Sequence, residues 1–168
     1  MSGTVLQQVR FRKAEPEDAT TLSSLAFRSK ASWGYDIDFM KRCRKELSYD
    51  AAEIESPDNV FYLCEINEEP VAFYALAMLG EGRAELEALF VRPGFIGQGF
   101  GKLLIEHMAA QAQALAIHTV TIQGDPNAEE FYLSIGAVPG GYRESASIRG
   151  RYLPVFVLSI GEGDKQCR

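Results

Sequence analysis

The stretch AELEALFVRPGFIGQGFGKLL, residues 84–104, is the most informative part of the chain. Residues 84–91 read as a strand, and the apolar positions from Leu104 onward recur at helical spacing. Three glycines stand between them at every second position: Gly97, Gly99 and Gly101. Glycine lets backbone N–H groups approach a ligand closely, and the start of a helix adds partial positive charge. The stretch therefore predicts a phosphate-binding loop that needs no cationic side chain.

Two widespread phosphate-binding loops do not fit this spacing. A P-loop requires a glycine where Ile96 stands, and a serine or threonine where Leu103 stands. A dinucleotide-binding loop requires GxGxxG near the first strand, with an acidic residue about twenty positions further on. Here the pattern is GxGxG in mid-chain, and residues 117–120 hold no acid. Neither loop type describes this protein.

Outward from this stretch, hydrophobic periodicity predicts one α/β domain over residues 1–168, without repeats or a linker. We expect strands at residues 9–12, 60–66, 71–79, 84–91, 119–123 and 151–160, and a less regular strand around 142–148. We expect helices at residues 17–30, 37–47, 101–115 and 127–135. Gly136 ends the last of these helices, because glycine is a common left-handed terminator.

Composition and charge narrow the class of protein. The 168 residues are 46% hydrophobic and 24% charged, as in an average globular domain, which argues against a disordered or collagen-like chain. The net charge of −6 provides no overall positive charge for binding nucleic acid or an anionic membrane, and it favours a cationic substrate. The longest apolar run, Val71–Leu79, is about half a membrane span. The first residues show no signal peptide, so we expect a cytoplasmic protein.

Cysteines and histidines indicate no metal site. Cys43, Cys64 and Cys167 are widely spaced and form no CxxC pair, so we expect reduced thiols and no disulfide. His107 and His118 stand apart from any ligand pattern and are expected to be structural or surface groups. We therefore expect no metal cofactor.

The chain resembles the GNAT superfamily of acyl-CoA-dependent N-acyltransferases in two motifs. Val91-Arg92-Pro93 followed by IGQGFG, residues 96–101, matches the family's strand end and phosphate loop, with Ile96 where arginine or glutamine is usual. NAEEFYLSIG, residues 127–136, matches the second signature. The resemblance covers roughly residues 9–160. It implies a mixed central sheet of six or seven strands with helices on both faces, in which strands 84–91 and 119–123 are parallel neighbours that splay apart.

The resemblance also implies where acetyl-CoA binds. Backbone N–H groups of the glycine loop would hold its pyrophosphate: Gly97, Gln98, Gly99, Phe100, Gly101 and Lys102. The strand end at Leu89, Phe90 and Val91 would pair with the pantetheine arm, to which Asn127 would hydrogen-bond. Tyr132 would face the thioester sulfur, where a phenol can protonate the departing thiolate. Tyr132 is therefore the candidate general acid, and an aromatic packed in the core is the alternative.

A catalytic base is also needed, because only a neutral amine attacks a thioester. Alternation along the strand places Glu85 and Glu87 on one face. Two neighbouring acids on a half-buried strand raise the pKa of at least one of them, which suits a base near neutrality. Either carboxylate is a candidate base or a binding group for a cationic substrate, and a solvated sheet face is the alternative.

The acceptor is the least determined part of the function. Trp33 and Tyr35 lie where the family often covers the acceptor pocket, which favours a small-molecule amine over a peptide amino group. The three cysteines lack a base partner that would mark a covalent carrier, so we expect direct attack in a ternary complex. We expect no nucleic-acid or membrane partner. A homodimer, a peptide acceptor, a dinucleotide-binding oxidoreductase and a non-catalytic acyl-CoA sensor stay open as alternatives.

Overall fold

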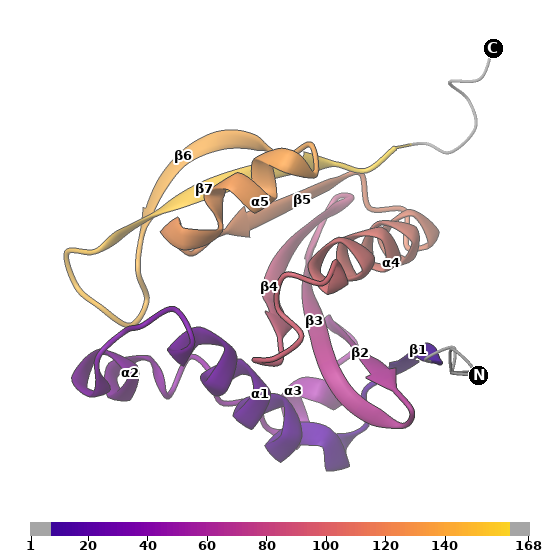
Figure 1. The fold of residues 1–168 in the computed structure, drawn as a ribbon. Helices are drawn as coiled ribbons and strands as arrows, with labels where there is room; N and C mark the ends of the chain where they lie inside the picture. Colours follow the sequence, from indigo (N-terminus) through magenta and orange to yellow (C-terminus); the bar gives the residue numbers. More distant parts are fainter. Residues whose placement is uncertain (1–7, 162–168) are drawn as a thin grey trace, which may run out of the picture.

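Seven strands form one mixed sheet in the computed structural model, which describes residues 8–161 (Figure 1). The strands are β1 (Val9–Lys13), β2 (Asn59–Ile66), β3 (Glu69–Gly80), β4 (Arg83–Val91), β5 (Thr119–Gln123), β6 (Val138–Glu144) and β7 (Tyr152–Ser159). The helices are α1 (Ala19–Ala31), α2 (Ile37–Cys43), α3 (Ala51–Glu55), α4 (Phe100–Ala114) and α5 (Glu129–Ser134), with 3-10 turns η1 (Pro16–Asp18) and η2 (Pro126–Ala128). The strand order is β1-β2-β3-β4-β5-β7-β6, with β4 and β5 parallel. The predicted fold class is confirmed.

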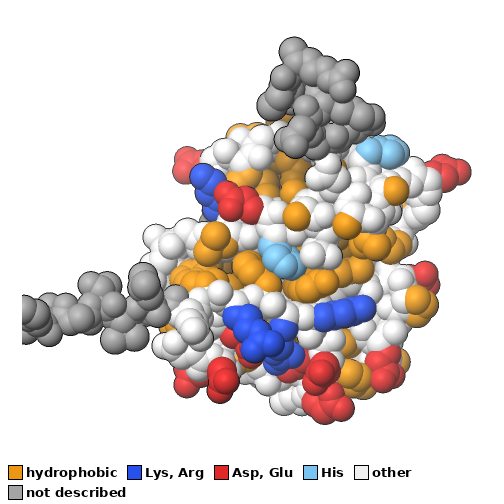
Figure 2. All heavy atoms as spheres, turned by 90° about the vertical axis from the view of Figure 1, so that its right-hand side faces the viewer, with side chains coloured by type: hydrophobic (Ala, Val, Ile, Leu, Met, Phe, Trp, Pro, Cys, Tyr) orange, Lys and Arg blue, Asp and Glu red, His pale blue; other side chains and the backbone are white. Residues whose placement is uncertain are grey.

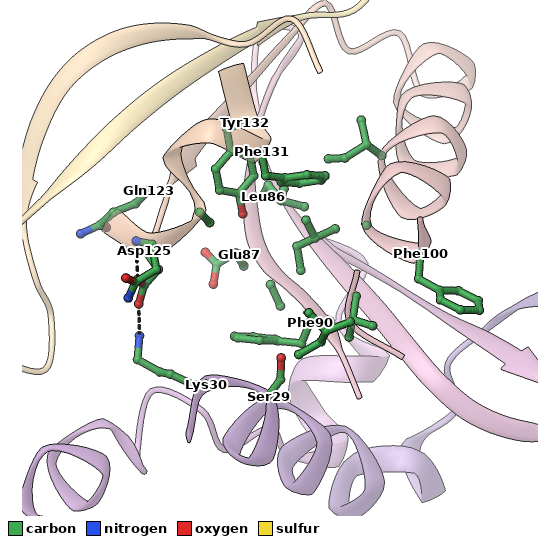
Figure 3. Close-up of a pocket in the computed structure, with 18 of the residues that line it drawn as sticks. Ser29, Lys30, Leu86, Glu87, Phe90, Phe100, Gln123, Asp125, Phe131 and Tyr132 are labelled. Atoms are coloured by element: carbon green, nitrogen blue, oxygen red, sulfur yellow. Dashed lines mark hydrogen bonds and ion pairs between the residues drawn. The ribbon is translucent and has the colours of Figure 1, made fainter. Parts of the chain in front are cut away.

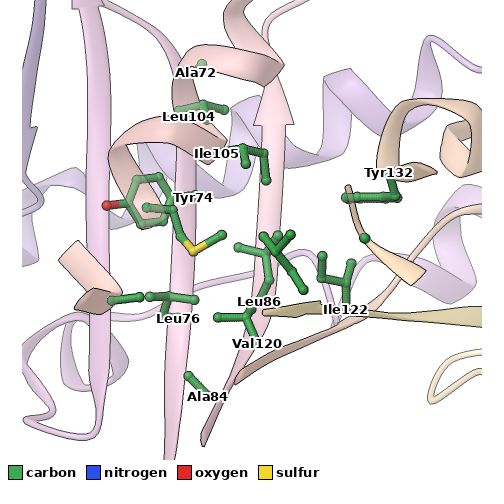
Figure 4. Packing of buried hydrophobic residues seen from close by; sticks show 14 of the residues in the cluster. Ala72, Tyr74, Leu76, Ala84, Leu86, Leu104, Ile105, Val120, Ile122 and Tyr132 are labelled. Carbon is green, nitrogen blue, oxygen red and sulfur yellow. The ribbon is translucent and has the colours of Figure 1, made fainter. Parts of the chain in front are cut away.

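Helices cover both faces of the sheet, and each face has its own core. On one face α4 packs Leu104 and Met108 into a cluster that also contains Tyr74 of β3 (Figure 4). On the other face Leu22 of α1 and Ile54 of α3 belong to a second cluster. The apolar residues of α1 and α4 recur three or four positions apart, so each helix presents one apolar stripe to the sheet.

β4 and β5 are paired over four positions, from Arg83↔Thr119 to Leu86↔Ile122. β4 then continues to Val91, and over this second half it pairs with β3. The two strands therefore diverge towards their carboxyl ends, as predicted. One edge of β4 is left without a strand partner at the point where the glycine loop begins.

A β-bulge at Glu87 interrupts the alternation of β4. The register with β3 shifts between Leu86 and Ala88, so Glu87 is the extra residue. Leu86 packs in the core beneath α4, whereas Ala88 packs in the core beneath α1. The strict alternation that predicted a shared face for Glu85 and Glu87 is therefore wrong at this point. Both carboxylates nevertheless line one cleft.

One helix was not predicted from the sequence, and one strand was predicted at the wrong residues. The helix expected over residues 37–47 ends at Cys43, and residues 51–55 form a separate helix, α3. Asp50 caps α3, because its side chain accepts a hydrogen bond of 2.8 Å from the backbone of Glu53. The irregular strand expected around 142–148 is β6, which starts at Val138 and carries a bulge between Pro139 and Tyr142. Proline and glycine there remove the alternation from which a strand is predicted.

The remaining cysteine and histidine expectations concern groups outside the site. Cys43 and Cys64 are buried free thiols, and Cys167 lies outside the described residues. His107 stacks on Phe11 with 4.1 Å between ring centres and its Nδ1 lies 2.8 Å from the Tyr74 hydroxyl. Within residues 8–161 no cluster of three or more His, Cys, Asp or Glu residues could hold a metal ion.

The surface on the side of α4 and β1 carries a band of hydrophobic side chains between groups of charged ones (Figure 2). No helix in the described part of the chain combines the length and the apolar character needed to cross a membrane.

Candidate active site

A cleft of about 1200 Å³ lies where β4 and β5 diverge (Figure 3). Its walls come from the second half of β4, the glycine loop, the first turns of α4, the β5–α5 connection and the segment from α1 to α3. All residues predicted for the site line this cleft except Tyr35 and Gln98. Gln98 instead ties the loop to itself, because its side-chain amide donates 2.8 Å to the Gly94 carbonyl.

The glycine loop presents free backbone donors to the cleft. Gly97 and Gly99 have φ of +81° and +90°, a conformation that favours glycine. Gly99 is the N-cap of α4 and supplies no side-chain cap. Among the described residues, the N–H groups of residues 97–102 donate to no backbone acceptor outside regular helix bonding. The loop and the start of α4 therefore leave a row of unsatisfied donors at the edge of the cleft, where an anion could bind.

Gly101 also allows a close contact between α4 and α5. A Cβ atom at Gly101 would lie 3.1 Å from the ring of Phe131. Cβ atoms at Gly97 and Gly99 would meet no heavy atom within 4 Å, so they would project into open space beside the loop. A side chain at Gly97 or Gly99 would occupy that space.

Tyr132 is an aromatic residue of the cleft wall whose hydroxyl points into the cleft (Figure 3). It is 7% exposed, and its ring packs against Phe131 and Phe156 at 5.2 and 5.4 Å between ring centres. A Cβ atom at Gly124 would lie 2.9 Å from this ring, so the close approach requires glycine there. The hydroxyl has no hydrogen-bond partner among the described residues and faces Glu87 (Figure 3). Burial, with the charge of Asp125, raises the pKa of Tyr132, so the phenol stays protonated.

The two glutamates of β4 differ in their partners. Glu85 is paired with Arg143 of β6, with 2.6 Å between Oε1 and Nη1. Glu87 forms no ion pair with any residue of the described chain. Burial, followed by the charges of Glu85, Glu53 and Glu46, raises the pKa of Glu87. The structure thus separates the two candidates: the carboxylate of Glu87 has no cationic partner, and that of Glu85 is held in an ion pair.

Asp125 is a polar residue of the cleft that sequence reasoning missed. Its side chain accepts hydrogen bonds from the backbone N–H of Asn127 at 2.9 Å and from the Tyr35 hydroxyl at 2.7 Å, and it lies 3.5 Å from Lys30 Nζ (Figure 3). Burial alone would raise the pKa of Asp125, but these bonds and the lysine charge hold that pKa below its ordinary value. Asp-Pro-Asn signals a helix start in the sequence. No local pattern in the sequence predicts that Asp125 contacts Tyr35, which stands 90 positions earlier.

Contacts between the α1–α3 side and the β6–β7 loop bridge one side of the cleft. The hydroxyl of Ser147 donates to the carboxylate of Glu46. Arg151 donates 2.9 Å to the Tyr35 hydroxyl, and its guanidinium lies 4.7 Å from the centre of the Phe39 ring. Trp33 is 46% exposed and lines the cleft beside this bridge.

A family model described as the acetyltransferase (GNAT) family matches residues 26–137, about two thirds of the chain. No curated protein matches the chain.

Solved acetyltransferase structures have the same fold. PaiA N-acetyltransferase from Thermoplasma acidophilum, in complex with coenzyme A, is 15% identical, has a TM-score of 0.69 and aligns over 90% of this chain and 99% of its own. The ribosomal-protein-S18-alanine N-acetyltransferase from Escherichia coli is 18% identical, with a TM-score of 0.68 over 93% and 98% of the two chains. A putative GNAT acetyltransferase from Desulfovibrio desulfuricans is 13% identical, with a TM-score of 0.73 over 92% and 100%. At such identities the likeness establishes the fold alone.

Proposed function

The chain belongs to the acetyltransferase (GNAT) family, and from this premise we propose that it is an N-acetyltransferase that moves an acetyl group from acetyl-CoA to the primary amine of a small molecule. One observation carries the proposal. A single cleft contains the free N–H groups of the glycine loop, the open edge of β4 and the unpartnered hydroxyl of Tyr132. A structure with the same fold, that of the Thermoplasma acidophilum PaiA protein, was solved with coenzyme A bound, which supports acyl-CoA as the donor.

The residues present fit acetyl-CoA. The donors of residues 97–102, at the start of a helix, suit a pyrophosphate. The edge of β4 from Leu89 to Val91 has no β5 partner, so its N–H and C=O groups suit the amides of a pantetheine arm. Ile96, where the family usually has arginine or glutamine, removes one side-chain contact and none of the backbone donors.

Two side chains divide the proton transfers. When bound, acetyl-CoA supplies an acetyl group on a thioester, whose carbon–sulfur bond breaks as the carbon–nitrogen bond of the amide forms. Tyr132 holds its proton because its pKa is raised, and it gives this proton to the sulfur that leaves as a thiol. Glu87, whose pKa is also raised, takes the proton that the attacking amine loses, directly or through water. Glu85 supports the site through its ion pair with Arg143.

The acceptor side favours a small amine over a polypeptide. A peptide that crosses the cleft needs an open groove between the α1–α3 side and the β6–β7 loop. Here Ser147 and Arg151 connect those two walls through Glu46 and Tyr35. The unpaired carboxylates of Glu53 and Glu87 line the same cleft and favour a cationic acceptor.

Thiol release from acetyl-CoA with a library of amines tests the function, with mass spectrometry of the products as the second readout. We expect turnover with small primary amines and an N-acetylated product. Turnover restricted to peptides would overturn the small-molecule part of the proposal. Binding of acetyl-CoA without turnover of any amine would favour a non-catalytic sensor, and binding of NADH in its place would favour an oxidoreductase.

A further inference from the structure

The carboxylate of Asp125 is the centre of a polar cluster that the chemistry above does not use. It accepts hydrogen bonds from the Tyr35 hydroxyl at 2.7 Å, from the backbone of Asn127 at 2.9 Å and from the side-chain amide of Asn127 at 2.9 Å. Lys30 Nζ and Arg151 Nη2 lie 3.5 and 3.8 Å from it. These partners come from α1, the α1–α2 connection, η2 and the residue before β7. One half-buried carboxylate thus joins four segments around the cleft.

The hydroxyl of Tyr35 completes the cluster and has no free hydrogen-bonding capacity. It donates to Asp125, and it accepts from the Asn127 amide at 3.0 Å and from Arg151 at 2.9 Å. Its ring stacks on Phe39 with 4.1 Å between centres, and the Arg151 guanidinium lies 5.3 Å from its centre. Burial and the neighbouring Asp125 raise the pKa of Tyr35, so its proton stays in place. The directions of all these hydrogen bonds are therefore fixed.

This arrangement decides which atom Asn127 can offer to a ligand. Both hydrogens of its side-chain amide have acceptors, one on Asp125 and one on Tyr35. A flipped amide would bring the Asn127 carbonyl oxygen against the Asp125 carboxylate, which is repulsive. The carbonyl oxygen is therefore the polar atom of this side chain that remains without a partner among the described residues. Asn127 lines the cleft, so it can serve a ligand as an acceptor and not as a donor.

We propose that Asp125 is a positioning residue, which acts with Tyr35 to hold Asn127 with its carbonyl oxygen available to an amide N–H of the pantetheine arm. The inference rests on the proposed use of acetyl-CoA. It adds an assignment that no local motif carries: Asp125 acts through Asn127 and makes no contact with the reacting atoms. It also gives Tyr35, expected from the resemblance to cover the acceptor pocket, a different task, because the Tyr35 hydroxyl donates to Asp125.

Binding of two ligands distinguishes a positioning role of Asp125 from a general structural role. Coenzyme A carries the pantetheine arm, whereas adenosine 3′-phosphate 5′-diphosphate has the same nucleotide and pyrophosphate without it. In Asp125→Asn we expect the Kd of coenzyme A, measured by calorimetry, to rise about tenfold, because the amide of Asn127 is no longer fixed. We expect the Kd of the truncated nucleotide to stay within about twofold, since the glycine loop holds it. Asp58→Asn makes the same charge change at an exposed aspartate outside the cleft and should alter neither value.

A second variant and a double mutant keep the proposal falsifiable. Tyr35→Phe removes the hydroxyl alone, and we expect a smaller, about threefold, loss that is again confined to coenzyme A. Asp125→Asn combined with Asn127→Ala should lose no more affinity than Asn127→Ala by itself, because Asp125 acts through Asn127. Equal losses for both ligands, additive losses in the double mutant, or an unchanged coenzyme A affinity would each overturn the proposal. Failure of the unsubstituted protein to bind coenzyme A would overturn the proposed function as well.

Discussion

The glycine-loop end of the cleft and the end lined by α1, η2 and the β6–β7 loop are built in different ways. The glycine-loop end comes from one contiguous segment, residues 89–102, and its working parts are backbone N–H groups and a strand edge. The other end is assembled from side chains of α1, the α1–α2 connection, η2 and the β6–β7 loop, among them Tyr35, Asp125 and Arg151. A site made of backbone follows from local sequence, whereas a site made of side chains depends on how distant segments meet. Substitutions at the two ends should therefore differ in how they change ligand binding and turnover.

The largest effect should come from the backbone-built end. Gly99→Val places a branched side chain at a φ of +90° and into the open space beside the loop, so the loop must change shape and lose donors to the pyrophosphate. Loss of two charge-assisted hydrogen bonds costs about 4 kcal/mol, which corresponds to about 1000-fold in Kd. Calorimetry with acetyl-CoA measures this. Gly161→Val, at a glycine with open surroundings and no positive φ, is the control; similar affinities in the two variants would contradict the loop assignment.

The next effect tests a side chain at the junction of the two ends. Tyr132→Phe keeps the ring in its packing against Phe131 and Phe156 and removes the hydroxyl. We expect kcat for thiol release to fall about 100-fold, as for loss of a general acid, with an unchanged Kd for coenzyme A. Tyr142→Phe, at an exposed tyrosine of β6, is the matched control. An unchanged kcat would assign the proton transfer to solvent.

A smaller effect distinguishes the two glutamates of β4. Glu87→Gln should lower kcat/KM about tenfold, because the proton acceptor is lost. Because the pKa of Glu87 is raised, its base form is lost as the pH falls through that pKa. The activity of the wild type should therefore begin to fall at a pH above the ordinary pKa range of a glutamate. This fall of activity at low pH should disappear in Glu87→Gln and persist in Glu85→Gln. If the fall of activity disappears in Glu85→Gln instead, Glu85 is the proton acceptor and Glu87 is not.

The smallest effect adds a side chain to the backbone-built end. Ile96 is 45% exposed and lines the cleft at the head of the glycine loop. Ile96→Arg adds a cation near the pyrophosphate, and we expect the Kd of acetyl-CoA to fall about threefold at low salt and less at high salt, as for an exposed ion pair. Ile37→Arg adds the same charge at an exposed site outside the cleft. An equal gain in both variants would show only a general charge effect.

The same contrast explains what the sequence could predict. β5 was predicted to the residue, and the glycine loop was found from three glycines, because in both cases the signal is local. The bulge at Glu87 was missed because an extra residue in a strand leaves no mark in composition. Asp125 was missed because its partners Tyr35 and Arg151 stand 90 and 26 positions away, and no spacing rule connects them.

The short register between β4 and β5 has a consequence for local unfolding. Four residue pairs join the strands β1–β4 to β5, β7 and β6 within the sheet, so this seam has the fewest paired residues of any two neighbouring strands. A ligand that spans the seam binds the closed form and opposes its opening by mass action, by about 2.7 kcal/mol at a hundredfold excess over Kd. Amide hydrogen exchange in β5 should therefore slow when coenzyme A is added, while exchange in β2, far from the seam, stays the same.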